Sequence, residues 1–212
     1  MKFFKLHYIY IFNKSIITLT IFLVLFSMLF FFINGISIKE QNVTASVMTY
    51  NELIANYNKL IIIIITIIIV CNSFLSENDY YRIYLYNNGM ISNKYIISKI
   101  VVLLSFIFLI ILIENFISNG ISIILFNKID MSVINNFINI IILSIVYFSF
   151  SLLFIILSDY FYIVVLIFII YLFLDSIEIN LLLCENPILS IIVSIILLLY
   201  SIFLYNKKDI II

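Results

Sequence analysis

Long apolar runs, each about the length of a membrane crossing, follow one another through this chain with only short polar segments between them. Hydrophobic residues make up 66% of the 212 residues and charged residues only 10%, with a mean hydropathy of +1.30. These values lie far from those of soluble domains, whereas a bilayer core about 30 Å thick accepts about 20 apolar residues per helical crossing. The sequence therefore predicts an integral membrane protein.

The apolar runs are continuous, which excludes a transmembrane β-barrel because barrel strands alternate apolar and polar residues. We expect an all-α integral membrane protein forming a single domain over residues 1–212, with almost no chain left for a soluble catalytic domain. Six transmembrane helices are predicted, at residues 15–33, 60–75, 100–126, 137–157, 160–174 and 188–205.

The N-terminal segment 1–14 contains Lys2 and Lys5 before an apolar run, as the start of a secretory signal does. The run is longer than a signal core, and no small-residue cleavage site follows it. We therefore interpret residues 1–14 as an N-terminal interfacial helix that leads into the first span.

Lysine and arginine are more frequent on the side of the membrane that would hold both termini and segment 76–99. The positive-inside rule then places that side in the cytoplasm of a multi-pass protein, in a bacterial plasma membrane or, as an alternative, an organelle membrane. The net charge of zero offers no basic surface for nucleic acid. The lipid bilayer is the expected environment.

Segment 76–99 is the main polar interruption, and it predicts a cytoplasmic surface helix. Ser76 can cap the helix, and Asn88-Gly89 can end it. A four-residue spacing puts the tyrosines and a leucine on one face, while Glu77 and Arg82 point elsewhere. The helix either docks a partner or lies at the headgroup level, where tyrosines are common. Its candidate docking residues are Glu77, Tyr80, Tyr81, Arg82, Tyr84 and Leu85.

Ser92 can cap a second helix that carries Lys99 into the third span, so these two residues are predicted to form a structural corner. Glu77 and Lys99 either form an exposed surface pair of little energetic value or fix this corner.

Glu114 is an ionisable residue within the third span, in the outer half of the bilayer. It either snorkels outward or pairs with Asn115 and Asn119, or it lines a translocation path together with them.

The sequence lacks the residues that several kinds of chemistry require. Three glycines, at positions 35, 89 and 120, are too few for a phosphate-binding loop. One histidine and two cysteines on opposite sides of the membrane give no metal site and no disulfide. Neither paired carboxylates nor Ser/Lys spacing supports an intramembrane protease. We expect no enzyme activity and no cofactor, so any energy would come from an ion gradient or a separate subunit.

The order of these features resembles that of the ABC-2 type permeases, the membrane subunits of a large group of ABC exporters. The resemblance covers the whole chain, but its local motifs are short. They are the interfacial helix, six spans, Glu77 after the second span, Asn88-Gly89, Ser92, Ser98-Lys99 and the ending Tyr205-Asn206-Lys207-Lys208-Asp209.

The resemblance implies an export permease whose coupling helix, at residues 77–88, sits in a groove of a separate ABC ATPase subunit. ATP and Mg would bind to that subunit. Two permease chains, as a homodimer or heterodimer, would join two ATPase chains. The substrate is left open among peptides, lipids, drug-like molecules and haem.

This chain departs from the family pattern in three ways: the turn lacks the common proline, tyrosines replace small residues in the coupling region, and the outer loops are short. Two alternatives therefore stay open. One is a permease like the haem exporter of cytochrome c maturation, although the basic, glycine-rich coupling loop of that group is not evident. The other is a non-transporting structural or assembly subunit of a membrane complex.

Overall fold

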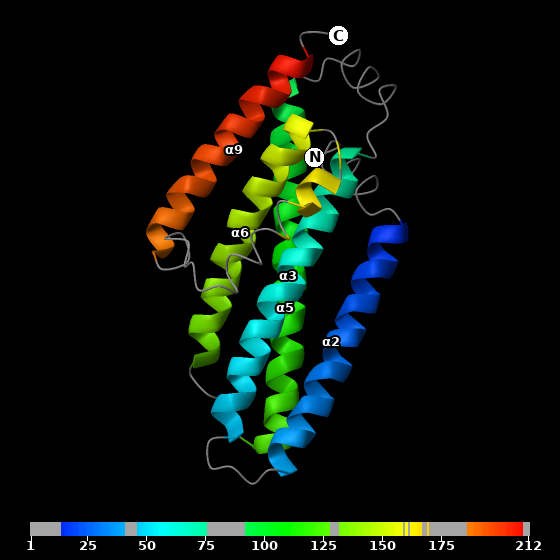
Figure 1. The fold of residues 1–212 in the computed structure, drawn as a ribbon, viewed down its shortest axis with the longest axis vertical. Coiled ribbons are helices and arrows are strands. Elements are labelled where there is room, and N and C mark those ends of the chain that lie inside the picture. The colour runs from blue at the N-terminus through cyan, green and yellow to red at the C-terminus, as the bar shows by residue number, and fades with distance from the viewer. Residues whose placement is uncertain are drawn as a thin grey trace.

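The computed structural model describes residues 14–40, 46–75, 92–127, 132–158, 160, 162–166, 169 and 186–209. In this part of the chain five long helices form a bundle and there are no strands (Figure 1). All five are long and apolar enough to cross a membrane, which confirms an all-α, multi-pass membrane architecture. They are α2 (Lys14–Glu40), α3 (Ser46–Leu75), α5 (Ser92–Phe126), α6 (Ser132–Ser158) and α9 (Pro187–Asp209).

The helices α3, α5 and α6 lie at the centre of the bundle, and α2 and α9 flank it on opposite sides (Figure 1). The α2 helix packs on α3 and α5, and α9 packs on α6 and α5. The chain runs antiparallel from α2 through α3 and α5 to α6. In contrast, α6 and α9 run in the same direction (Figure 1).

The helices extend beyond the predicted spans. The second span was expected to start at residue 60, but α3 begins at Ser46. Likewise α2 continues to Glu40. The α5 helix runs from Ser92, the residue expected to cap the helix that leads into the third span. With 30 residues, α3 is about 45 Å long, which exceeds a hydrocarbon core of about 30 Å. The apolar runs mark where lipid can surround a helix, whereas its backbone hydrogen bonds continue into the polar residues on either side.

Two helix ends have clear local causes. Asn127 follows α5 with a φ of 53°, and its N–H donates to the carbonyl of Ile123 over 2.9 Å, which is a left-handed C-terminal cap. At the start of α9, the Asn186 side-chain oxygen accepts from the N–H groups of Ile188 (3.2 Å) and Leu189 (3.4 Å). Pro187 occupies the first turn, where its missing N–H costs nothing.

Two clusters of buried hydrophobic residues are found in the described part of the chain. The larger cluster joins α3, α5 and α6 through residues such as Ile69, Leu103 and Leu152. The smaller one packs Phe31 of α2 and Tyr50 of α3 against the C-terminal part of α5. Tyr50 is fully buried, so the polar beginning of α3 is held as a helix by contacts with its neighbours.

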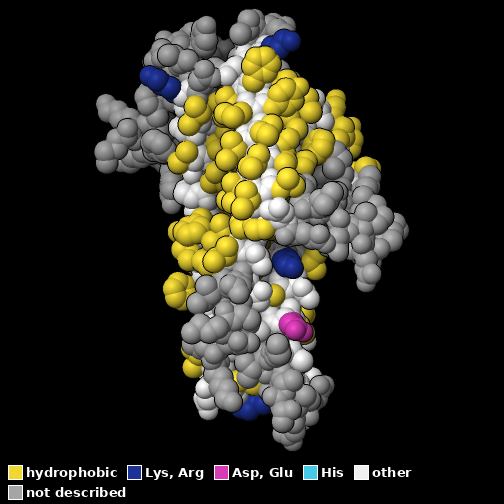
Figure 2. All heavy atoms as spheres, turned by 90° about the vertical axis from the view of Figure 1, so that its left-hand side faces the viewer, with side chains coloured by type: hydrophobic (Ala, Val, Ile, Leu, Met, Phe, Trp, Pro, Cys, Tyr) yellow, Lys and Arg dark blue, Asp and Glu magenta, His cyan; other side chains and the backbone are white. Residues whose placement is uncertain are grey.

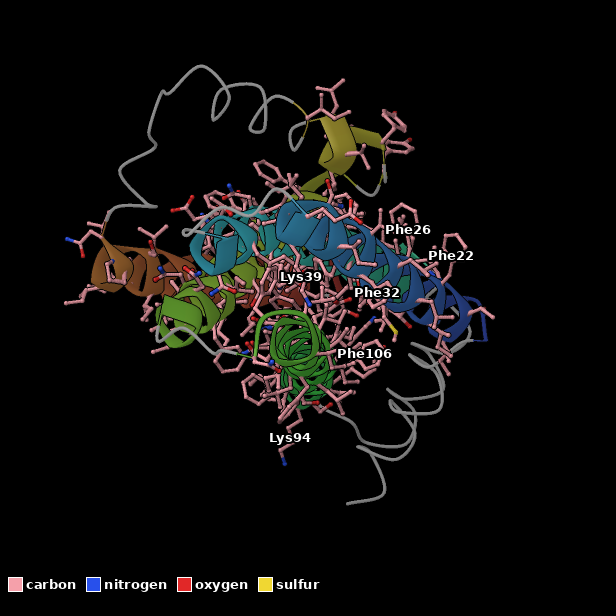
Figure 3. All side chains as sticks on the ribbon, turned by 90° about the horizontal axis from the view of Figure 1, so that it is seen from below. Phe22, Phe26, Phe32, Lys39, Lys94 and Phe106 are labelled. Atoms are coloured by element: carbon pink, nitrogen blue, oxygen red, sulfur yellow. The ribbon has the colours of Figure 1, made fainter. Side chains whose placement is uncertain are left out.

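The outward faces of α2 and α9 are apolar and largely exposed. Phe22 and Phe26 project from α2 away from the bundle (Figure 3). Apolar side chains cover most of the upper part of the face shown in Figure 2. These surfaces fit a lipid environment, where apolar side chains carry no penalty for exposure.

Several predicted elements lie outside the described residues. They are the interfacial helix up to residue 13, the coupling helix at 77–88 and most of the span at 160–174. The count of six spans therefore stays a prediction.

Candidate functional site

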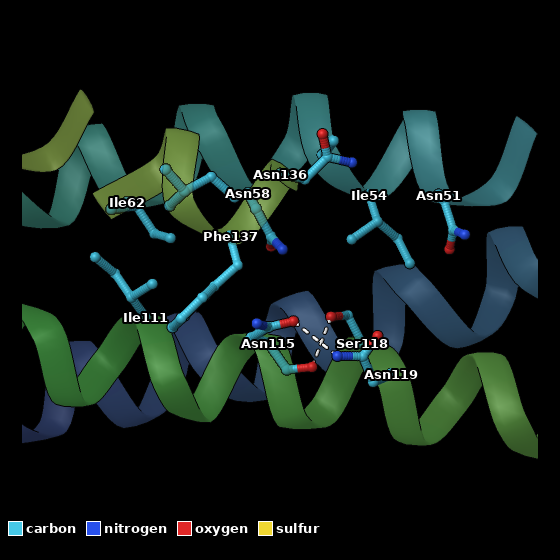
Figure 4. Close-up of a pocket in the computed structure, with 12 residues that line it drawn as sticks. Asn51, Ile54, Asn58, Ile62, Ile111, Asn115, Ser118, Asn119, Asn136 and Phe137 are labelled. Carbon is cyan, nitrogen blue, oxygen red and sulfur yellow. Dashed lines mark hydrogen bonds between the residues drawn. The ribbon is translucent and has the colours of Figure 1, made fainter. Parts of the chain in front are cut away.

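A cavity of about 30 Å³ lies between α3, α5 and α6 (Figure 4). Five asparagines and a serine give it an unusually polar wall for a bundle of apolar helices. Its lining consists of Asn51, Ile54, Ala55, Asn58 and Ile62 from α3, Ile111, Asn115, Ser118 and Asn119 from α5, and Asn136, Phe137 and Ile140 from α6.

Helical spacing brings the polar groups of each helix onto one side. Asn51 and Asn58 are seven residues, or about two turns, apart on α3. On α5, the Asn119 side-chain N–H donates to the Asn115 side-chain oxygen over 2.8 Å. Ser118 donates to the Asn115 backbone carbonyl over 3.0 Å. The α5 side of the cavity is thus organised by its own hydrogen bonds, seen as dashed lines in Figure 4.

The α3 side of the cavity is different. The Asn51 side-chain nitrogen and the Asn58 side-chain oxygen have no hydrogen-bond partner among the described residues. The two residues are only 6% and 5% exposed. A buried polar atom without a partner costs about 1–3 kcal/mol. These two amide atoms therefore require something that the described part of the chain does not supply.

Glu114 is next to Asn115 in sequence but faces another helix. Its carboxyl oxygens lie 2.9 Å and 2.7 Å from the Ser27 hydroxyl on α2, and the glutamate is fully buried. The Ser27 oxygen also lies 2.8 Å from the Val24 carbonyl. Successive residues of an α-helix point about 100° apart, which explains why Asn115 lines the cavity and Glu114 does not.

Lys99 occupies a third polar position, at the opposite end of α5. It is 1% exposed, and its Nζ donates to the Ser73 carbonyl over 2.7 Å. The same nitrogen lies 3.8 Å from the centroid of the Phe74 ring, a distance typical of a cation–π contact. Ser73 and Phe74 belong to the last turn of α3, so Lys99 joins α5 to α3 there.

The predicted site residues separate into three groups. The candidate docking residues, from Glu77 to Leu85, lie outside the described part of the chain. Ser92 begins α5. The third group is divided by the structure: Asn115 and Asn119 meet at the cavity, and Glu114 binds Ser27 instead of either asparagine.

Sequence analysis missed Asn51, Asn58 and Asn136 at the cavity. Asn51 and Asn58 precede the span predicted at residues 60–75 and were not singled out as site residues. Their seven-residue spacing, which places both on one helix face, was the available signal. Across the described ranges, no group of three or more His, Cys, Asp or Glu side chains could hold a metal ion.

No family model, curated protein or solved structure matches this chain.

Proposed function

We propose that this chain is the membrane-spanning permease subunit of an ATP-driven exporter of the ABC-2 type. A separate ABC ATPase, which binds ATP and Mg, would dock on the segment between α3 and α5. The observation that carries the proposal is the contact of Lys99 with the Ser73 carbonyl, because it ties together the two helices that bracket this segment.

The two helices could transmit a displacement over a long distance. They contain 30 and 35 residues, so each is about 45 Å long or more. At one end they are joined by buried Lys99, and further along they supply most of the lining of the asparagine cavity. A push on the segment that connects them would therefore move the walls of a polar cavity within the bundle.

The direction of the last helices supports a sixth span. Since α6 and α9 run in the same direction, the chain between Ser158 and Pro187 has to return toward the other end of the bundle. The apolar run at 160–174 has the composition for that crossing. Six spans with both termini in the cytoplasm are the topology of the proposed family.

A second permease chain, identical or different, completes the proposed transporter. This chain would contribute no catalytic group, and ATP hydrolysis would take place on the partner subunit. The substrate class is left open, because apolar helix faces of this kind suit many molecules.

A non-transporting structural or assembly subunit is the second candidate. It is favoured by the size of the cavity, since about 30 Å³ is far too small for a transported organic molecule in this conformation. The permease proposal requires the bundle to open at another stage of a cycle.

Purification of the tagged full-length chain from its native membrane in a mild detergent tests the proposal. We expect an ATPase subunit in stoichiometric amount. Recovery of intact chain without an ATPase, under conditions that preserve complexes, would count against a permease. Stoichiometric recovery with a larger complex that lacks an ATPase would favour the structural subunit.

Substitutions sharpen this test in proteoliposomes. Glu77→Gln and Arg82→Gln should leave ATP hydrolysis by the partner in place while export falls. Lys94→Gln is the matched control, because Lys94 is an exposed residue near the start of α5 that points away from the bundle (Figure 3). Equal export by all three variants and the unmodified chain would reject the coupling role of segment 77–88.

A further inference from the structure

The two buried amide atoms on α3 point into the asparagine cavity. Figure 4 shows Asn51 and Asn58 extending from α3 toward α5. One leaves a donor, Nδ2, and the other leaves an acceptor, Oδ1, without a partner in the described part of the chain. Within a membrane protein such groups are satisfied by neighbouring chain, by ordered water or by a ligand.

The size of the cavity sets how much can enter. Its volume is about 30 Å³. A space of this size admits water-sized groups but no large organic molecule.

The charge of the lining selects a neutral ligand. None of the described lining residues is charged, and Glu114 is turned toward Ser27 on α2. A dehydrated ion in such a site would lack a countercharge, which is far more costly than burying a neutral polar group.

The hydrogen-bonding pattern selects a hydroxyl group. A ligand atom must accept from the Asn51 amide and another must donate to the Asn58 amide. The two residues are seven positions, or about 10.5 Å, apart along α3, so each amide atom needs its own group, and an O–H group suits either place because it can both accept and donate. A half-turn of an amide exchanges its oxygen and nitrogen, and a separate hydroxyl group at that amide suits either orientation, because it donates to an oxygen or accepts from an N–H group.

The two sides of the cavity differ in exposure. Asn115, Asn119 and Asn136 are partly exposed, whereas Asn51 and Asn58 are buried. Among the described residues the α5 and α6 side is thus the more exposed one, and the α3 side forms the floor.

We propose that the cavity lined by Asn51, Asn58, Asn115 and Asn119 is a binding site for neutral hydroxyl groups, supplied by water or by a small polyol. The inference does not depend on the permease proposal. It assigns the hydrogen bonds that the two α3 amides lack to O–H groups held between three helices.

The chain offers a specific reporter for this site. Its two alanines are Ala45 and Ala55, and Ala55 lies in the cavity wall. The protein is labelled at its alanine methyl groups and placed in a bilayer of deuterated lipid. Its solid-state NMR spectrum then contains two methyl signals. The signal that is lost in an Ala45→Ser variant belongs to Ala45, so the other belongs to Ala55. The measurement is the rate of polarisation transfer from water protons to the Ala55 methyl.

A dry control can be placed on the same helix. Cys71 is fully buried in the larger hydrophobic cluster, so Cys71→Ala adds a methyl reporter in an apolar part of α3. We expect transfer from water to be several-fold faster at Ala55 than at position 71. Equal, slow transfer at both positions would overturn the proposal.

Substitution of both floor residues tests the role of the amides. In the Asn51→Leu/Asn58→Leu variant, transfer to Ala55 should fall to the rate at position 71. An unchanged rate would mean that water reaches Ala55 without these amides, and the proposal would fail. If this variant does not fold, the comparison of Ala55 with position 71 in the Cys71→Ala chain and the ligand titrations still test the proposal.

Titrations separate the ligand sources. A glycerol titration measures polarisation transfer from the glycerol C–H protons to Ala55. Saturable transfer that is matched by a loss of transfer from water would identify a polyol site. Water transfer that glycerol leaves unchanged would identify water as the occupant, and both results support a hydroxyl site. A saturable shift of the Ala55 signal with NaCl or KCl, without fast water transfer, would show an ion site and reject the proposal.

Discussion

Lys99 of α5 donates a hydrogen bond of 2.7 Å to the backbone carbonyl of Ser73, in the last turn of α3. The final carbonyls of a helix have no partner within the helix, and a cation is favourable near them because of the helix dipole. The Phe74 ring, 3.8 Å from the same nitrogen, adds a second favourable contact. A lysine near the start of one helix thus completes the end of another.

Removal of this amino group should destabilise the bundle. Lys99→Met keeps most of the buried stem but leaves the Ser73 carbonyl without its donor. We expect a loss of about 1–3 kcal/mol in the free energy of unfolding, measured by detergent titration. Lys94→Met, on the exposed face of α5, is the control and should change stability by less than about 0.5 kcal/mol. Equal effects of the two substitutions would show that the Ser73 contact contributes nothing.

Two glycines should respond to alanine with opposite signs. A methyl group at Gly35 on α2 would collide with the Leu125 side chain and lie 3.0 Å from the Tyr50 ring. Overpacking of this kind costs about 1–3 kcal/mol. A methyl group at Gly120 would have no atom of a neighbouring helix within 4 Å among the described residues, so Gly120→Ala should gain about 0.5–1 kcal/mol of helix stability. Thermal unfolding of both variants checks the pair, and destabilisation of similar size at both positions would contradict the packing of α2 against α5.

The Ser27 and Glu114 side chains should be energetically coupled. Ser27→Ala removes a hydroxyl that contacts the buried carboxyl group, and Glu114→Leu removes the carboxyl group. Contacting residues usually show an interaction energy of about 0.5–3 kcal/mol in a double-mutant cycle. We expect Ser27→Ala to be clearly less harmful in the Glu114→Leu background than in the unmodified chain. Strict additivity of the two changes would mean that the contact is absent in the membrane.

Cys71 should be protected from thiol reagents in the folded protein. It is fully buried in the larger hydrophobic cluster, and it is a free cysteine. In a Cys184→Ser background, a membrane-permeant maleimide should modify Cys71 only after unfolding in SDS. A Lys94→Cys substitution, made in a chain without other cysteines, should react before unfolding because position 94 is exposed. Rapid labelling of Cys71 in the native state would argue against the packing of α3 between α5 and α6.

The sequence alone determined that this is a helical membrane protein with an apolar interior. Apolar runs of about 20 residues admit only helices in a bilayer, because every backbone N–H and C=O must find its partner within the segment. The same runs placed Glu114 within the third span and Lys99 just before its start. The docking role of segment 77–88 and the ABC-2 resemblance rest on sequence and stay predictions.

The tertiary structure decided where the helices begin and what each polar residue faces. The polar residues at the start of α3 stay helical because Tyr50 is buried against α2 and α5, which no local pattern reports. Helical periodicity shows that Asn51 and Asn58 share a face, but the helix opposite that face depends on how the bundle packs. For that reason packing brings Asn58 and Asn115, which lie on different helices, to one cavity and turns neighbouring Glu114 toward Ser27.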